Sequence, residues 1–136
     1  MIAFDADVII YAAAADHPLG ARVLPVFAGP TPAGVGSVLL LPEVLTKPLR
    51  SDPGSEESAA LLRLLGRLEL RPLDEPTGRL AVDLAITYGL RAADAAHLAT
   101  AVAAGADRFL TNNRKDFPRS IAEIDVVYPD DLPLAG

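Results

Sequence analysis

Cysteine is absent from this chain of 136 residues, and histidine occurs only twice, as His17 and His97. A chain without cysteine has no disulfide framework, no thiolate zinc site and no thiol nucleophile. Two histidines leave little scope for imidazole chemistry. Any catalysis is therefore expected to depend on carboxylates.

Long apolar runs and a basic leader segment are lacking as well. Asp5 and Asp7 interrupt the apolar N-terminus almost at once, and no uninterrupted apolar run approaches the ~18 residues needed to span a bilayer. The sequence therefore predicts a cytoplasmic protein with no membrane partner.

The composition is that of a folded protein, with 51% hydrophobic and 22% charged residues and no biased tract. It excludes a disordered chain, a coiled coil and a collagen-like repeat, and the length predicts one globular domain over residues 1–136. The net charge of −6 argues against a nucleic-acid partner, unless several of the acids are gathered at one site.

Apolar segments with strand and helix patterns alternate along the chain. Strands are expected at 2–4, near 35, at 70–73, 108–111 and 125–128, and helices at 8–15, 18–27, 38–49, 55–68, 75–88 and 95–104, with a single turn at 120–124. Residues 38–41 also fit the end of a strand. The alternation predicts an α/β fold, a three-layer α/β/α sandwich with a central parallel sheet, whose ligands bind outside the carboxyl ends of the strands.

Two acids follow the first predicted strand. Asp5 comes directly after its buried residues, where such folds place active sites, and Asp7 lies two positions later. Either carboxylate could instead cap the following helix by accepting hydrogen bonds from its free amides. We interpret Asp5 as functional, and for Asp7 both interpretations stay open.

Two further acids lie in or next to predicted helices. Glu43 stands among leucines and valine, where a carboxylate needs water or a cation, or else it is the solvated face of a helix, paired with Lys47 four residues on. Asp94 opens an alanine-rich helix, where a helix cap and a metal ligand are equally reasonable interpretations. His97 shares the face of Asp94, but it is interpreted as a packed core residue and is left out of the site.

A polar segment follows the strand at 108–111. Thr111, Asn113 and Asp116 lie there at the carboxyl end of a strand, although a type I turn alone would explain the asparagines, and Asp116 could simply pair with Arg114, Lys115 or Arg119 on the surface.

In the predicted sheet these segments converge at one edge. A cluster of three or four carboxylates without cysteine selects Mg²⁺ or Mn²⁺, ions that polarise phosphate oxygens and activate water, so phosphodiester hydrolysis is the predicted reaction class. With the acids assigned to the site, the rest of the chain is nearly neutral. The cations expected to hold substrate phosphates are Lys47, Arg50, Arg114 and Lys115.

Four motifs together resemble the PIN-domain family, especially VapC-type toxins of bacterial toxin–antitoxin pairs. They are I-A-F-D-A-D-V-I-I at 2–10, L-P-E-V-L at 41–45, R-A-A-D-A-A-H-L-A-T-A at 91–101 and F-L-T-N-N-R-K-D-F at 109–117. The resemblance implies a metal-dependent endoribonuclease, usually a homodimer, that is neutralised by a small antitoxin whose tail enters the active-site groove.

The same resemblance assigns Asp5, Glu43 and Asp94 to the acidic triad of the family. Many members have an aspartate where this chain has Asn113, so the fourth acid could be Asp116. Asn113 could offer only its carbonyl oxygen as a ligand or bind a metal-bound water, and the Thr111 hydroxyl would help to hold the loop in place.

Two competing hypotheses remain at this point. F-D-A-D-V at 4–8 also resembles the nucleophile motif of haloacid-dehalogenase-type phosphatases, although Val8 and Ile9 stand where that motif usually has threonine or serine. A non-catalytic member of the PIN fold, acting as a dimerisation or antitoxin-binding module, is the other. Phosphate retained on Asp5 would favour the first, and weak metal binding without nuclease activity the second.

Overall fold

A five-stranded, entirely parallel sheet forms the centre of the computed structural model, which describes residues 1–14 and 16–134. The strands are β1 (Ile2–Phe4), β2 (Gly34–Ser37), β3 (Leu68–Arg71), β4 (Arg108–Leu110) and β5 (Asp125–Val127), in the spatial order β3-β2-β1-β4-β5. The first strand of the chain is thus the central one, with crossovers leading to both sides of it.

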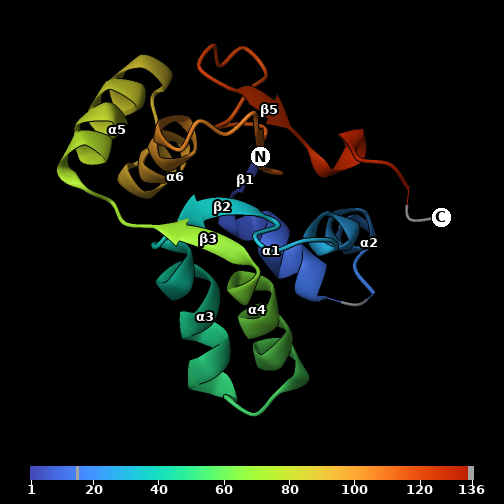
Figure 1. The fold of residues 1–136 in the computed structure, drawn as a ribbon. Helices are drawn as coiled ribbons and strands as arrows, with labels where there is room; N and C mark the ends of the chain where they lie inside the picture. Colours follow the sequence, from blue (N-terminus) through green and yellow to red (C-terminus); the bar gives the residue numbers. More distant parts are fainter. Residues whose placement is uncertain (15, 135–136) are drawn as a thin grey trace.

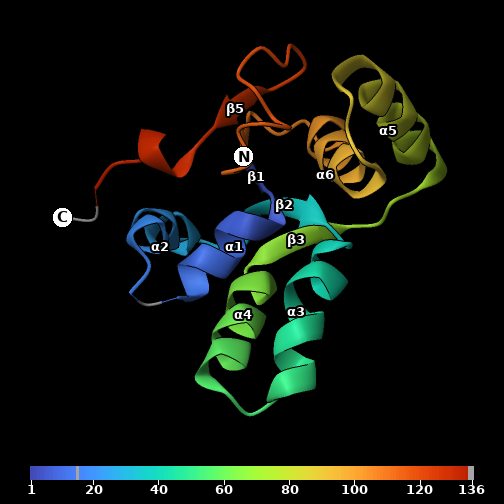
Figure 2. The ribbon, with the colours of Figure 1, turned by 180° about the vertical axis from the view of Figure 1, so that it is seen from behind.

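Helices cover both faces of this sheet, as the three-layer prediction requires (Figure 1). They are α1 (Ala6–Ala13), α2 (Pro18–Val23), α3 (Leu40–Ser51), α4 (Glu56–Gly66), α5 (Glu75–Tyr88) and α6 (Ala92–Ala103), with 3₁₀ helices η1 (Leu24–Phe27) and η2 (Pro129–Asp131). Seen from behind, α5 and α6 again lie on one side of the sheet and α3 and α4 on the other (Figure 2).

The two cores lie on opposite faces of the sheet because side chains alternate along a strand. In β1, Ile2 and Phe4 join the core under α1, α3 and α4, whereas Ala3 joins the core under α5 and α6. The register continues this separation into β4, where Leu110 pairs with Phe4 and Phe109 with Ala3. Both faces of the sheet are therefore buried, as a parallel sheet requires.

Most predicted elements are present, with shifted boundaries. Ser37 ends β2, and its hydroxyl accepts a hydrogen bond from the Leu39 amide, so α3 begins at Leu40 and continues to Ser51. β3 lies two residues earlier than predicted, and 120–124 forms no helical turn. The first helix begins at Ala6, and the predicted residue 15 lies outside the described residues.

Glycine ends α5 as predicted. Gly89 adopts φ 66°, the left-handed conformation that favours glycine, and its amide bonds the carbonyl of Ala85. The chain then enters α6, which packs on α5 and on β1, β2 and β4. None of the helices in residues 1–14 and 16–134 is both long and apolar enough to cross a membrane.

The carboxyl ends of β1 and β4 meet at one edge of the sheet. Phe4 is paired with Leu110, and the next amide, of Asp5, donates to the carbonyl of Leu110 at 3.0 Å. The polar residues that follow the two strands, Asp5 and Thr111, are consequently neighbours. This edge is where the sequence placed the candidate chemistry.

Candidate active site

Asp5 links β1, α1 and the end of β4. As the N-cap of α1 it accepts a hydrogen bond from the Ala6 amide through Oδ1 at 2.8 Å, while Oδ2 accepts one from the Thr111 hydroxyl at 2.7 Å. The residue is only 6% exposed. The helix-cap interpretation of Asp5 is therefore confirmed, and the residue also lies in the polar cluster at the strand ends, where its functional role stays a prediction.

Burial raises the pKa of Asp5 above its ordinary value, because a low-dielectric surrounding disfavours the charged form. The hydrogen bond from Thr111 and the nearby His97 act in the opposite direction, and the Glu43 carboxylate raises the pKa further. The pKa of Asp5 thus reports groups on α3, α6 and the loop after β4. These elements converge on one site.

Asp7 lies in the first turn of α1 and also faces this cluster. Its Oδ2 accepts a hydrogen bond from the Asn112 amide at 3.1 Å, whereas its buried Oδ1 has no hydrogen-bond partner among the described residues. Burial, followed by repulsion from Asp5 and Asp94, raises the pKa of Asp7 to about 7. A half-satisfied buried carboxylate is costly unless a proton or a cation compensates for it.

Asp94 approaches the cluster from α6. It is the third residue of that helix and is half-buried, and the N-cap position belongs to Arg91, which makes no side-chain cap bond. Burial raises the pKa of Asp94 most, followed by repulsion from Asp5 and Asp116, while His97 opposes the shift. The predicted cap role is therefore not the one Asp94 has in the structure, and its surroundings are those of a site carboxylate.

Glu43 and His97 form a contact that the sequence interpretation missed. Nε2 of His97 lies 3.1 Å from Oε2 of Glu43, joining α6 to α3, and the His97 side chain is 1% exposed. The approach is not aligned as a hydrogen bond, and neither ring nitrogen has another hydrogen-bond partner in the part of the chain that is described. Lys47, the predicted partner of Glu43, forms no ion pair within the described residues.

A signal for His97 was available in the sequence. It lies three residues after Asp94 on a helix, so the two side chains share a face, and Glu43 needed a cation or water near it. The predicted burial of His97 is confirmed, whereas its contact with Glu43 was not predicted.

The loop after β4 forms a hydrogen-bonded turn. The Asn113 side-chain amide donates to Asp116 Oδ2 at 2.9 Å, and the Asp116 amide donates to Asn113 Oδ1 at 3.3 Å. The Asn113 amide also donates to the Thr111 hydroxyl at 3.0 Å. Asn113 and Asp116 are thus joined to each other and, through Thr111, to Asp5.

Among the described residues, Asp116 does not form the predicted surface ion pair with Arg114 or Arg119. Arg114 pairs with Asp130 at 2.6 Å and Arg119 with Asp131 at 2.6 Å, so the nearest guanidinium groups are bound elsewhere. The repulsion that Asp116 exerts on Asp94 indicates that it faces the cluster.

The candidate phosphate-binding cations lie on the surface. Lys47 and Arg50 are exposed on α3, and Lys115 is exposed in the loop after β4. Arg114 is half-exposed and already has the Asp130 carboxylate as its partner. The described structure therefore gives Lys47, Arg50 and Lys115 no competing ion pair.

The chemistry of these side chains fits a hard divalent cation. Among residues 1–14 and 16–134, no three histidine or acidic side chains are arranged as a ready-made metal site. The donors are carboxylate oxygens, the type that Mg²⁺ and Mn²⁺ prefer, and one of them, Asp7 Oδ1, is buried without a partner. Mutual repulsion among Asp5, Asp7 and Asp94 is a cost that positive charge would offset.

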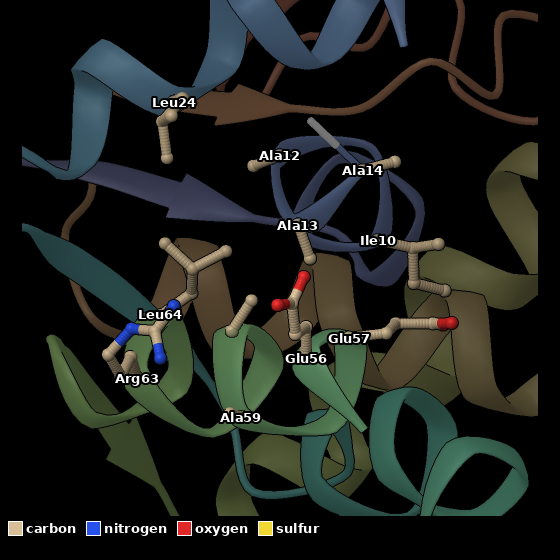
Figure 3. Close-up of a pocket in the computed structure, with 11 residues that line it drawn as sticks. Ile10, Ala12, Ala13, Ala14, Leu24, Glu56, Glu57, Ala59, Arg63 and Leu64 are labelled. Carbon is tan, nitrogen blue, oxygen red and sulfur yellow. The ribbon is translucent and has the colours of Figure 1, made fainter. Parts of the chain in front are cut away.

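A separate groove of about 780 Å³ lies between α1 and α4. Figure 3 shows Ala13 of α1 facing α4, with Glu56 and Glu57 toward one end of the groove and Arg63 toward the other. None of the candidate site acids lines it. Hollow shape and clustered acids thus occur in different places in this molecule.

Comparison with known families settles what the fold is. The model of the PIN domain matches residues 2–122. The chain belongs to the PIN-domain family. The four motifs singled out in the sequence lie within the matched PIN segment, and membership replaces the phosphatase resemblance as the context for Asp5 and Asp7.

Solved structures agree with the PIN fold over nearly the whole chain. A toxin–antitoxin complex from Klebsiella pneumoniae matches with a TM-score of 0.74 at 22% identity, covering 95% of this chain and 98% of that one. VapBC2 from Rickettsia felis, bound to a promoter DNA fragment, gives 0.69 at 20% identity, with 94% and 98% covered. FitAB bound to the IR36 DNA fragment gives 0.70 at 22% identity, with 98% of each chain covered.

At these identities the likeness shows the PIN fold alone. A comparison with curated protein sequences gives no significant match. The roles of individual residues in this PIN domain must therefore be argued from its own site.

Proposed function

We propose that this PIN-domain protein is a Mg²⁺- or Mn²⁺-dependent endoribonuclease and the toxin of a toxin–antitoxin pair. The observation that carries the proposal is the convergence of acids from four segments, with the pKa of Asp7 raised to about 7 by burial and by its acidic neighbours. A site that gathers this much negative charge, with one buried oxygen left unpartnered, suits a divalent cation.

The metal ligands in this proposal are Asp5, Glu43, Asp94 and Asp116. A bound divalent ion would supply the charge that polarises a phosphate oxygen and lowers the pKa of water near it. The Thr111 hydroxyl orients Asp5, and His97 contacts Glu43. Asp7 and Asn113 act as auxiliary groups, Asp7 by holding the Asn112 amide and Asn113 by holding Asp116.

RNA phosphates would be held by Lys47 and Arg50 on α3 and by Arg114 and Lys115 in the loop after β4. Lys47 and Arg50 follow Glu43 on α3, and Arg114 and Lys115 precede Asp116 in the loop, so both groups of cations lie close to site acids along the chain. The positive charges of these side chains would compensate the negative charge of the RNA backbone, while the acids would bind the divalent cation.

The partner in this proposal is a small cognate antitoxin. Its support is that the structures sharing this fold include a toxin–antitoxin complex, VapBC2 and FitAB. We further propose that residues 1–136 act as one domain, that the protein is a homodimer, and that it works in the cytoplasm, where its RNA substrate is found.

The test is cleavage of a fluorescently labelled RNA by the purified full chain with Mg²⁺, Mn²⁺ or EDTA. We expect cleavage with either ion and none in EDTA, because carboxylates alone supply no strong nucleophile at neutral pH. Undiminished cleavage in EDTA would contradict the metal requirement.

A non-catalytic binding module is the second candidate. It is favoured by one observation, that no group of three site side chains in the described residues is prearranged for a metal. Calorimetric titration with Mn²⁺ together with the cleavage assay separates the two, since a binding module would bind the ion weakly and would not cleave RNA.

A further inference from the structure

The loop that carries Asn113 and Asp116 is fastened to the segment that follows β5. The chain between β4 and β5 forms an orange-red loop that leads into β5 in Figure 1. Tyr128 comes directly after β5, is 5% exposed and donates its hydroxyl hydrogen to the carbonyl of Phe117 at 2.7 Å. Phe117 is the residue next to Asp116.

The Tyr128 ring also contacts two arginines of the same loop. The guanidinium carbon of Arg114 lies 4.5 Å from the ring centroid and that of Arg119 lies 4.6 Å from it. Both distances are within the range of favourable cation–π contacts. One tyrosine therefore holds the loop by a hydrogen bond at its middle and by a charge contact on either side of Asp116.

The two arginines are held on the ring by acids of η2. Arg114 pairs with Asp130, and Arg119 pairs with Asp131 through two contacts of 2.6 and 2.7 Å. Asp131 in addition accepts a hydrogen bond from the Tyr128 amide at 2.9 Å. These acids orient the guanidinium groups over the ring, so the contact is a built arrangement.

The inner side of the loop is anchored as well. Phe117 is fully buried, its ring lies 5.0 Å from that of Phe109, and its amide donates to the carbonyl of Asn113 at 2.9 Å. The Tyr128 hydroxyl thus bonds to the carbonyl of a residue whose amide closes the turn. Release of that carbonyl would loosen the turn in which Asn113 holds Asp116.

We propose that Tyr128 is a positioning residue of the active site, which fixes the loop 112–119 so that Asp116 faces the other acids. The proposal rests on the proposed function for the part that Asp116 plays in metal binding. Tyr128 touches neither substrate nor ion in this proposal. It acts through the Phe117 carbonyl and through Arg114 and Arg119.

The test compares Tyr128→Phe with Tyr88→Phe in the full chain. Tyr128→Phe keeps the ring and its contacts with the arginines and loses only the hydroxyl bond to Phe117. Tyr88 is a matched control, because its hydroxyl also joins two segments, donating to Glu123 and accepting from the Ala122 amide at 3.1 Å. The segment that Tyr88 holds carries no candidate site residue.

Two measurements are made on each variant. Amide hydrogen exchange reports protection of residues 111–118, and calorimetric titration with MnCl₂ reports metal affinity. We expect Tyr128→Phe to lose protection in this segment and to bind Mn²⁺ about 10-fold more weakly, as removal of groups that orient metal ligands typically does. Tyr88→Phe should match wild type in both. In RNA cleavage, the kcat of Tyr128→Phe should fall with little change in KM.

Unchanged exchange and Mn²⁺ affinity in Tyr128→Phe would overturn the proposal, and so would an equal loss in both tyrosine variants. If Tyr128→Phe does not fold, Arg119→Gln removes one charge contact from the exposed side of the ring and should shift both readouts in the same direction. Absence of Mn²⁺ binding by the wild-type protein would refute the proposed metal site, and the exchange data alone would then decide whether Tyr128 holds the loop.

Discussion

The acidic site has an inner and an outer half that differ in how their oxygens are held. In the inner half, Asp5 and Asp7 are tied to the Ala6 and Asn112 amides and the Thr111 hydroxyl. In the outer half, Glu43 and Asp94 are partly exposed, and neither accepts a hydrogen bond within the described residues. The inner pair is set by the fold, whereas the outer pair keeps the freedom to turn toward a cation or a substrate.

This difference shows that the position of a carboxylate and its freedom to turn toward a ligand are separate properties. Hydrogen bonds to the inner acids hold the strand ends and α1 together, so changing these acids alters the fold as well as the chemistry. Changing the outer acids should alter the chemistry alone. The predictions below test this division, beginning with the largest expected effect.

Asp94→Asn should abolish RNA cleavage, with a loss of at least about 1,000-fold, while thermal stability stays equal or rises. Removing one charge from a crowded cluster relieves repulsion, but it also removes a proposed metal ligand. Cleavage assays and thermal unfolding are measured together, with Asp83→Asn on the exposed face of α5 as the control. Retention of most of the cleavage rate would exclude Asp94 from the metal site.

Stability of the metal-free protein should fall as pH rises from about 4 to 7. The pKa of Asp7 is raised to about 7 in the folded state, so the folded protein binds more protons than the unfolded chain in this window, and raising the pH favours unfolding. The raised pKa values of Asp5 and Asp94 act in the same direction. Asp7→Asn should reduce the fall in the free energy of unfolding over this pH range by about 2–4 kcal/mol.

Denaturant unfolding at a series of pH values measures this effect. Mg²⁺ should stabilise the wild-type protein more at pH 8 than at pH 5, because protons and the cation relieve the same repulsion. A free energy of unfolding that stays constant between pH 4 and 7 would show that the folded state does not raise the pKa values of the inner acids.

Thr111→Val should destabilise the protein by about 1–3 kcal/mol, because it removes the donor to Asp5 and the acceptor for the Asn113 amide. Thr111→Ser keeps the hydroxyl and should retain most of this stability. Chemical denaturation of both variants measures the difference. Equal behaviour of valine and serine would indicate that the hydroxyl does not hold the inner half.

Asp116→Ala should weaken Mg²⁺ binding by about 10-fold, more than Asn113→Ala does, because only Asp116 brings a full charge to the site. Calorimetric titrations of the two variants give the comparison. If Asp116→Ala binds the ion like wild type, three carboxylates remain in the site, those of Asp5, Glu43 and Asp94.

The smallest expected effect concerns the proposed phosphate-binding cations on α3. Replacing Lys47 and Arg50 by glutamine should reduce the slope of log affinity for RNA against log salt by about 1–2 and leave metal affinity unchanged. Filter binding of RNA to the Asp94→Asn background at several salt concentrations measures the slope. An unchanged slope would make these cations ordinary solvated residues of α3.

The sequence predicted the layers of this fold because alternating apolar segments leave few other arrangements, and Gly89 marked the end of α5 correctly. It also indicated that Asp5 and Thr111 lie together, since parallel strand ends share an edge. Boundaries were less certain at Ser37, where a single hydroxyl bond delays the helix. The contact of His97 with Glu43 joins helices that cover opposite faces of the sheet, so the helix face shared by Asp94 and His97 could not by itself identify the partner.

The hydrogen bond between Asp5 and Thr111 spans 106 residues of chain. A ribosome that adds residues at about 5–20 per second therefore needs roughly 5–20 s after making the first partner before it has made the second. During that interval the growing polypeptide has no completed inner half. Under the proposed function, a nascent chain is consequently unable to cut RNA beside its ribosome until Thr111 has been added.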